Sequence, residues 1–213
     1  STDETTSYII SNYSWQADFF RVDVDRFGDY NFAVENEGWS ISTKYSRITS
    51  DNVDSIYYRK PMLPDLREYD SQYHLMIQRD IISVINGIAD SFTGKVLTKP
   101  SILRKTENKI YQLLYAVGHG WKIPQSYIGN DIAACKYYAN NTSIIKPITI
   151  GKTYGKSGWE LYQTNIFKSL YEDISITPIY LQEYIPKQFE VRVTIIGKNI
   201  YPVRIDTQNR VDW

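Results

Sequence analysis

The stretch that decides the fold is YLQEYIPKQFEVRVTIIGKNIYPVRID, residues 180–206. It begins as a short apolar and aromatic strand, which ends in the polar hinge QEYI at 182–185. Pro186 stops this strand because proline cannot donate to a strand ladder. The next segment alternates charged and apolar residues with the period of two that a half-exposed strand requires. We therefore predict a strand, a hinge and a hairpin, in that order.

The predicted hairpin carries charged side chains on both of its strands. Period two places Glu190 and Arg192 on one face of its first strand. Gly197 marks the turn, so Arg204 falls on the adjacent second strand. We expect the two guanidinium groups to converge on one cleft, where their planar forks would suit phosphate. The alternative is an ordinary amphipathic hairpin with solvated charges.

The hinge and the acid beside it suit a nucleotide. The hinge backbone offers N–H and C=O groups to an adenine edge. Glu190 can accept hydrogen bonds from ribose hydroxyls. An ATP-dependent ligase is therefore the leading hypothesis from this stretch.

Composition limits the class of protein. The 213 residues suffice for one large domain or two modest ones. With 24 basic and 24 acidic residues the net charge is zero, which argues against nucleic acid and polybasic membrane contacts. No apolar run reaches the length of a membrane span, and no signal sequence is evident. The single cysteine, Cys135, permits no intrachain disulfide, so we expect a cytoplasmic protein in which Cys135 is buried.

Periodicity divides the chain into three parts. Residues 1–100 form a predicted N-terminal α/β domain, with a helix over 5–13, a strand over 19–27, a hairpin around Glu37 and Gly38, a strand over 53–61 and a helix over 80–88. Residues 101–188 form a central subdomain, with a helix over 108–117, strands over 123–128 and 143–148, a helix over 131–139 and the glycine-rich loop 151–158. Residues 189–213 begin a C-terminal subdomain.

Two lysines are candidate phosphate ligands. Lys146 ends a strand-like run before Pro147, so a rigid element would hold its ammonium. The loop at 151–158 could fold over phosphates through backbone N–H groups, but it matches no GxxxxGK[ST] signature, and a surface turn is the alternative. Lys109, at the start of the 108–117 helix, could reach the nucleotide from the other wall of the cleft. A solvated surface lysine is the alternative there.

Together these segments resemble the ATP-grasp superfamily and, within it, the peptide maturases that build graspetides, the microviridin-type ω-ester and ω-amide ligases. The resemblance implies an α/β ATP-grasp fold: an N-terminal α/β domain followed by central and C-terminal ATP-grasp subdomains, the last incomplete in this chain. The segments that carry it are FFRVDVDRF (19–27), SIYYRKPMLP (55–64), ENKIYQLLYAVGHGWKIPQSYIGN (107–130), SIIKPI (143–148), LYQTN (161–165), PIYLQEYIPKQFEVRVTIIG (178–197) and RIDTQNRVDW (204–213).

The resemblance implies an ADP-forming ligase that uses ATP and Mg²⁺. Such enzymes phosphorylate an Asp or Glu side chain of a precursor peptide, and a Ser/Thr hydroxyl or Lys amine of the same peptide then attacks the acyl phosphate. The expected partner is the precursor peptide, leader and core, and relatives often form homodimers. Two alternatives stay open: a ligase that adds amino acids to a small molecule or a protein tail, and a non-catalytic homologue that binds a leader peptide.

The resemblance also assigns roles by position. Family members continue past the equivalent of Asp212 and Trp213 into strands with the main metal ligands, so we expect this chain to be an incomplete catalyst. We further hypothesise that 158–177 contributes to a leader-peptide groove through Trp159, Tyr162, Phe167 and Tyr171. The carried-over roles are phosphate binding for Lys109 and Lys146, adenine binding for Gln182, Glu183, Tyr184 and Ile185, ribose binding for Glu190, catalysis at the transferring phosphoryl group for Arg192 and Arg204, and metal binding for Asp206.

Overall fold

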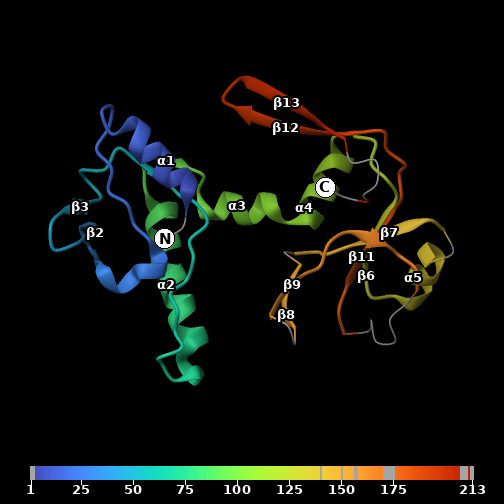
Figure 1. Cartoon of the computed structure of the whole chain (residues 1–213), viewed down its shortest axis with the longest axis horizontal. Coiled ribbons are helices and arrows are strands. Elements are labelled where there is room, and N and C mark those ends of the chain that lie inside the picture. Colours follow the sequence, from blue (N-terminus) through green and yellow to red (C-terminus); the bar gives the residue numbers. More distant parts are fainter. Residues whose placement is uncertain are drawn as a thin grey trace. The chain divides into compact units, whose positions relative to one another are not determined.

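The chain forms two compact units, Ser1–Lys105 and Thr106–Trp213. The computed structural model describes residues 3–139, 141–149, 151–155, 158–169, 176–206 and 211. Figure 1 shows helices and short strands in both units. None of the described helices is both long and apolar enough to cross a membrane. The further predicted boundary at residue 188 stays a prediction.

The first unit combines an antiparallel meander, β1-β2-β3, with a parallel pair, β4 and β5. The predicted hairpin around Gly38 is confirmed as β1 and β2. In chain order the elements are α1 (Glu4–Tyr13), the 3₁₀ helix η1 (Val24–Asp29), β1 (Asn31–Glu35), β2 (Gly38–Ser42), β3 (Arg47–Thr49), β4 (Ser55–Tyr57), α2 (Ser71–Ser91), β5 (Lys95–Leu97) and α3 (Pro100–Glu107).

Side-chain caps fix where the helices of this unit begin. Asp3 accepts a hydrogen bond from Thr6 N–H at 2.9 Å and so caps α1, which confirms the predicted helix over 5–13. Asp70 accepts from Gln72 N–H at 3.1 Å and caps α2. The predicted helix over 80–88 is the apolar C-terminal half of α2.

The predicted strand over 19–27 is wrong, because within the described residues this segment pairs with no strand. Its second half forms η1, where Arg26 N–H donates to Asp23 O at 2.9 Å. The alternation reflects burial instead, since Phe20 and Val22 pack against the core of the unit. That core consists of Trp39, Ile41, Ile88 and Phe92.

The second unit is built on a four-stranded sheet of order β10-β7-β11-β6, in which every adjacent pair is antiparallel. The predicted strands and helices of this part are confirmed as α4, β6, α5, β7 and β11. In chain order the elements are α4 (Lys109–Gly118), β6 (Ser126–Gly129), α5 (Ile132–Ala139), β7 (Ser143–Lys146), β8 (Lys152–Gly155), β9 (Gly158–Leu161), β10 (Asn165–Ile166), β11 (Ile179–Glu183), β12 (Glu190–Ile196) and β13 (Asn199–Ile205).

One face of this sheet packs into a core, which we call the core face. Leu181 on β11 is 0% exposed and packs with side chains of α5. Cys135 is buried there as predicted, and burial raises the pKa of its thiol. The core-face residues are Cys135, Tyr138, Phe167 and Leu181, with Tyr127, Ile145 and Ile179 packed against them.

The predicted hairpin at the end of the chain is confirmed as β12 and β13. Its register runs from Glu190 opposite Ile205 to Ile196 opposite Asn199. Gly197 has a φ of 60° in the two-residue turn, a conformation that glycine adopts without the steric cost of a side chain.

Candidate functional site

The opposite face of the sheet carries polar side chains from three strands. Tyr180 and Gln182 are two residues apart on β11 and therefore share a face. The register places Lys146 of β7 opposite Tyr180, and Ser126 of β6 opposite Gln182. We call this set, Ser126, Lys146, Tyr180 and Gln182, the polar face.

Lys146 is held on the polar face by an aromatic ring. Its Nζ lies 6.0 Å from the centroid of the Tyr180 ring, and Tyr180 is itself buried. A cation over a tyrosine ring is attracted by the negative π face, an effect that strengthens when the pair is shielded from water. The strand, and not a mobile loop, thus sets where this ammonium lies.

Gln182 is buried and hydrogen-bonded within the sheet. Its Nε2 donates to Ser126 Oγ at 2.8 Å and to Tyr180 Oη at 3.1 Å. Ser126 Oγ donates in turn to Pro124 O at 2.9 Å. The side chain predicted to bind adenine is therefore a member of a polar network that spans β11 and β6.

The hinge after β11 leaves one donor available. Glu183 N–H donates to Gln125 O at 2.8 Å, and Tyr184 N–H donates to Thr142 O at 3.0 Å. Ile185 N–H donates to no described residue. The Glu183 carboxylate accepts from Gln125 N–H at 3.2 Å and is on the core-face side of the strand by period two. Ile185 can thus serve a ligand through its backbone N–H, and the Glu183 assignment stays a prediction.

The structure brings Lys109 to the end of β7. Asn108 caps α4 by accepting from Ile110 N–H and Tyr111 N–H, each at 3.0 Å. Lys109 Nζ donates to the carbonyl of Pro147, the residue that follows Lys146. The two predicted phosphate ligands therefore approach the same strand end from different elements, and their phosphate role stays a prediction.

The predicted convergence of Arg192 and Arg204 is wrong. In the observed register Arg204 lies opposite Val191, whereas Arg192 lies opposite Val203. Directly opposed residues of an antiparallel pair share a face, so the two arginines lie on opposite faces of the hairpin. The Arg204 guanidinium stacks 4.4 Å from the Phe189 ring centroid, which agrees with this register. The prediction that the two arginines lie on adjacent strands is correct. A difference of one residue in register places a side chain on the other face of the hairpin, and this separates Arg204 from Arg192.

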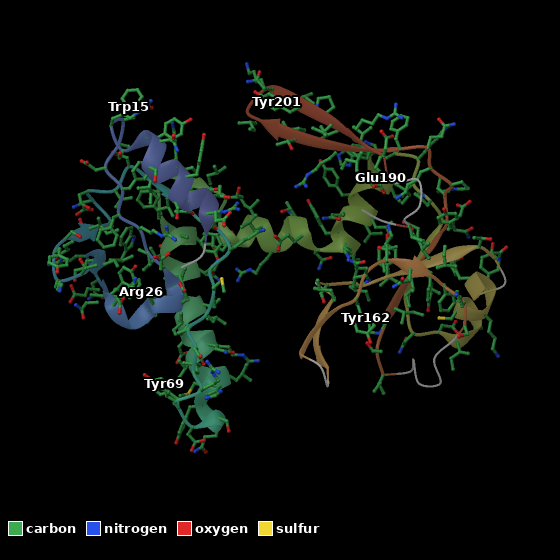
Figure 2. The ribbon with its side chains drawn as sticks, viewed as in Figure 1. Trp15, Arg26, Tyr69, Tyr162, Glu190 and Tyr201 are labelled. Carbon is green, nitrogen blue, oxygen red and sulfur yellow. The ribbon has the colours of Figure 1, made fainter. Side chains whose placement is uncertain are left out.

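The acidic candidates are both paired. Glu190, which opens β12 (Figure 2), accepts from Lys187 Nζ, and this ammonium also donates to Val211 O at 2.9 Å. Asp206 accepts from Arg204 Nε at 3.0 Å. Within the described part of the chain no three His, Cys, Asp or Glu side chains are grouped to hold a metal ion. Asp206 thus offers a single carboxylate to a metal.

The predicted glycine-rich loop is a strand pair. β8 and β9 pair antiparallel from Lys152 opposite Leu161 to Gly155 opposite Gly158, and residues 156 and 157 lie outside the described residues. Gly151 packs against the chain beyond the pair, since a Cβ there would lie 2.3 Å from Tyr162 O. Tyr162 N–H donates to Gly151 O at 2.5 Å.

The aromatic residues predicted for a peptide groove separate in the structure. Phe167 is buried in the core-face cluster, so its assignment to a groove is wrong. Tyr162, which follows β9 and is labelled in Figure 2, is 63% exposed. Tyr171 and the side chain of Trp159 lie outside the described part of the chain.

Sequence reasoning missed Ser126 and Tyr180. Both are ordinary strand residues in the predicted elements, and only the pairing of β6, β7 and β11 shows that they contact Gln182 and Lys146. The alternation of Tyr180 and Gln182 along one strand was the available signal.

The comparisons with known proteins establish the fold. No protein-family model and no curated protein matches the chain. The macrocyclase MdnC from Microcystis aeruginosa MRC, solved with its precursor peptide MdnA, matches with a TM-score of 0.89 and 23% identity over 98% of this chain and 73% of that one. A RiPP-associated ATP-grasp ligase from Chryseobacterium gregarium, solved with ADP and a leader and core peptide, matches with a TM-score of 0.78 and 23% identity over 99% and 66%.

The macrocyclase MdnB from Microcystis aeruginosa MRC matches with a TM-score of 0.78 and 22% identity over 97% of this chain and 73% of that one. The predicted fold class is confirmed: the chain has the ATP-grasp fold, in the form found in these two macrocyclases and this ligase.

Proposed function

We propose that the protein is an ADP-forming ATP-grasp ligase that forms ω-ester or ω-amide crosslinks in a ribosomally made precursor peptide. The observation that carries the proposal is the polar face, which places Lys146 and Gln182 beside the hinge in this fold. Two similar structures, a macrocyclase solved with its precursor peptide and a ligase solved with ADP and peptides, support the same activity.

In this proposal the nucleotide lies along the polar face. The adenine edge meets the hinge backbone, where Ile185 N–H is available as a donor. Lys146 and Lys109 meet the phosphates at the end of β7 as point charges. Glu190, oriented by Lys187, accepts from the ribose hydroxyls.

Arg192 and Arg204 would act separately in this proposal, because they lie on opposite faces of the hairpin and do not converge on one group. Arg192 shares a face with Glu190 and would stabilise the transferring phosphoryl group from there. Arg204 and Asp206 form the pair on the other face. When bound, Mg²⁺ neutralises phosphate charge, and it is commonly held by one or two carboxylates together with the phosphates, a pattern that Asp206 fits as one ligand.

The chemistry then proceeds on the peptide. A side-chain carboxylate of the peptide attacks the γ-phosphorus, ADP leaves, and the carboxylate becomes an acyl phosphate. A hydroxyl or amine of the same peptide attacks the acyl carbon and loses its proton, and inorganic phosphate leaves. Each crosslink therefore consumes one ATP and removes one water from the peptide.

Peptide-dependent ADP release tests the proposal. The protein is incubated with Mg-ATP, with and without a candidate precursor peptide that carries a leader and a core, and the peptide is weighed by mass spectrometry. ADP release that requires the peptide, with loss of one water mass per crosslink, is the expected result. Peptide binding without ADP release or mass change would favour the non-catalytic alternative, and product from free amino acids would favour a small-molecule ligase.

A further inference from the structure

The carboxamide of Gln182 has one orientation that satisfies its neighbours. Its Nε2 donates to both Ser126 Oγ, at 2.8 Å, and Tyr180 Oη, at 3.1 Å. A serine hydroxyl has one hydrogen, and that of Ser126 is donated to Pro124 O at 2.9 Å. Ser126 Oγ can therefore only accept from Gln182.

The reversed amide would lose hydrogen bonds. Gln182 Oε1 would then face Ser126 Oγ, and two acceptors would meet unless Ser126 abandoned Pro124. Tyr180 does not oppose the reversal, because a phenol hydroxyl can accept from Nε2 or donate to Oε1 equally well. Ser126, and not Tyr180, thus sets which end of the amide points outward.

The fixed amide leaves its carbonyl oxygen available as an acceptor. Gln182 Oε1 accepts from no described residue. Among the described side chains that are not exposed, Ser143 Oγ alone is both closed to solvent and without a partner, so Oε1 retains access to solvent. An outward carbonyl oxygen attracts an amino group and repels a second carbonyl. The 6-amino group of adenine and the 6-oxo group of hypoxanthine or guanine differ in this respect.

We propose that Ser126 is a positioning residue for base selection, which holds Gln182 Oε1 outward so that the nucleotide site prefers a 6-aminopurine to a 6-oxopurine. The inference rests on the proposed nucleotide site. It concerns a residue that the roles assigned above do not include, and it acts through Gln182 without requiring contact between Ser126 and the base.

Comparing two hydroxyl deletions around the same amide tests this inference. Dissociation constants of Mg-ATP and Mg-ITP are measured by calorimetry for the full chain and for Ser126→Ala and Tyr180→Phe. ITP carries a 6-oxo group in place of the 6-amino group and a proton on N1, and the N1 difference is common to all three proteins. Wild type should prefer ATP by roughly tenfold or more, since a mispaired polar group at such a site costs about 1.4 kcal/mol or more. Ser126→Ala should lose the part of that preference that comes from Gln182, through tighter ITP binding, and Tyr180→Phe should keep the full preference.

Two further readouts separate base selection from folding. Ser126→Thr, which retains the hydroxyl, should restore the preference, and thermal melting should show all three variants folded. Equal ATP preference in wild type and Ser126→Ala, or equal loss in Tyr180→Phe, would overturn the role of Ser126 while leaving the nucleotide site standing. Absence of binding of either nucleotide to wild type would overturn the proposed site and this inference together.

Discussion

The two faces of the sheet formed by β6, β7 and β11 use the same strands for different purposes. On the core face, Leu181 and its neighbours are closed to water by α5. On the polar face, one residue away along β11, Tyr180 and Gln182 hold a lysine and a serine in fixed geometry. Because successive strand residues alternate, each binding side chain is flanked by residues that fix its strand. We infer that the rigidity of the candidate site derives from the core behind it.

Leu181→Ala should give the largest effect on stability and tests the core half of the comparison. The side chain is 0% exposed, so its truncation leaves a cavity that the rest of the core cannot fill. We expect a loss of about 2–5 kcal/mol in the free energy of unfolding, measured by chemical denaturation. A change well below 1 kcal/mol would show that α5 does not close this face.

Lys146→Ala should reduce activity and leave stability almost unchanged, in contrast to Leu181→Ala. Peptide-dependent ADP release should fall by roughly a hundredfold or more, because a charge aimed at the phosphates is lost. The melting temperature should change little, since the Lys146 ammonium lies on the polar face and takes no part in the core-face cluster. Lys136→Ala, at an exposed position of α5, is the matched control and should retain activity. Turnover like that of wild type in Lys146→Ala would contradict the nucleotide assignment.

Arg192→Ala and Arg204→Ala test the two faces of the hairpin. Each should reduce peptide-dependent ADP release to a measurable residual rate, Arg192→Ala the more strongly, without unfolding the protein. Because the register separates the two side chains, their effects on the activation free energy should add to within about 0.5 kcal/mol in a double-mutant cycle. A coupling energy of several times this size would indicate that both guanidinium groups act on one phosphoryl group, as the sequence alone suggested.

Ser143→Ala should have the smallest effect on the free energy of unfolding. It tests a buried hydroxyl without a hydrogen-bond partner, unlike the hydrogen-bonded groups of the polar face. Ser143 is 1% exposed, and its Oγ has no partner among the described residues. Removing a buried hydroxyl that makes no hydrogen bond should leave stability unchanged or raise it by up to about 1 kcal/mol. A clear loss of stability on denaturation would mean that this hydroxyl is hydrogen-bonded in solution.

The sequence predicted the elements of the second unit better than their contacts. Alternation and breakers located β7, β11 and the β12–β13 hairpin, because these signals are local. The face on which Arg204 lies depends on register, which the turn at Gly197 sets and which period two cannot supply alone. The strand predicted over 19–27 failed for a related reason, since alternation records burial and not pairing.

The candidate site was predicted in part. Lys109 Nζ donates to the carbonyl of Pro147, the residue after Lys146, although nothing in the sequence spacing of the two lysines requires it. Phe167 was assigned to a groove because aromatic residues were abundant in its segment, but its side chain is buried in the core-face cluster. Ser126 carries no motif, and its importance emerges only from the three hydrogen bonds that connect Pro124, Ser126, Gln182 and Tyr180.

Covalent labelling with an acyl-phosphate derivative of ATP tests the central claim most directly. Such a probe acylates lysines that lie beside the bound phosphates, and the modified residues are located by peptide mass spectrometry. The account predicts labelling of Lys146 and Lys109 that excess ATP prevents, and no ATP-sensitive labelling of Lys136 on the other side of the sheet. ATP-sensitive labelling of Lys136, or none at Lys146 and Lys109, would contradict a nucleotide site on the polar face.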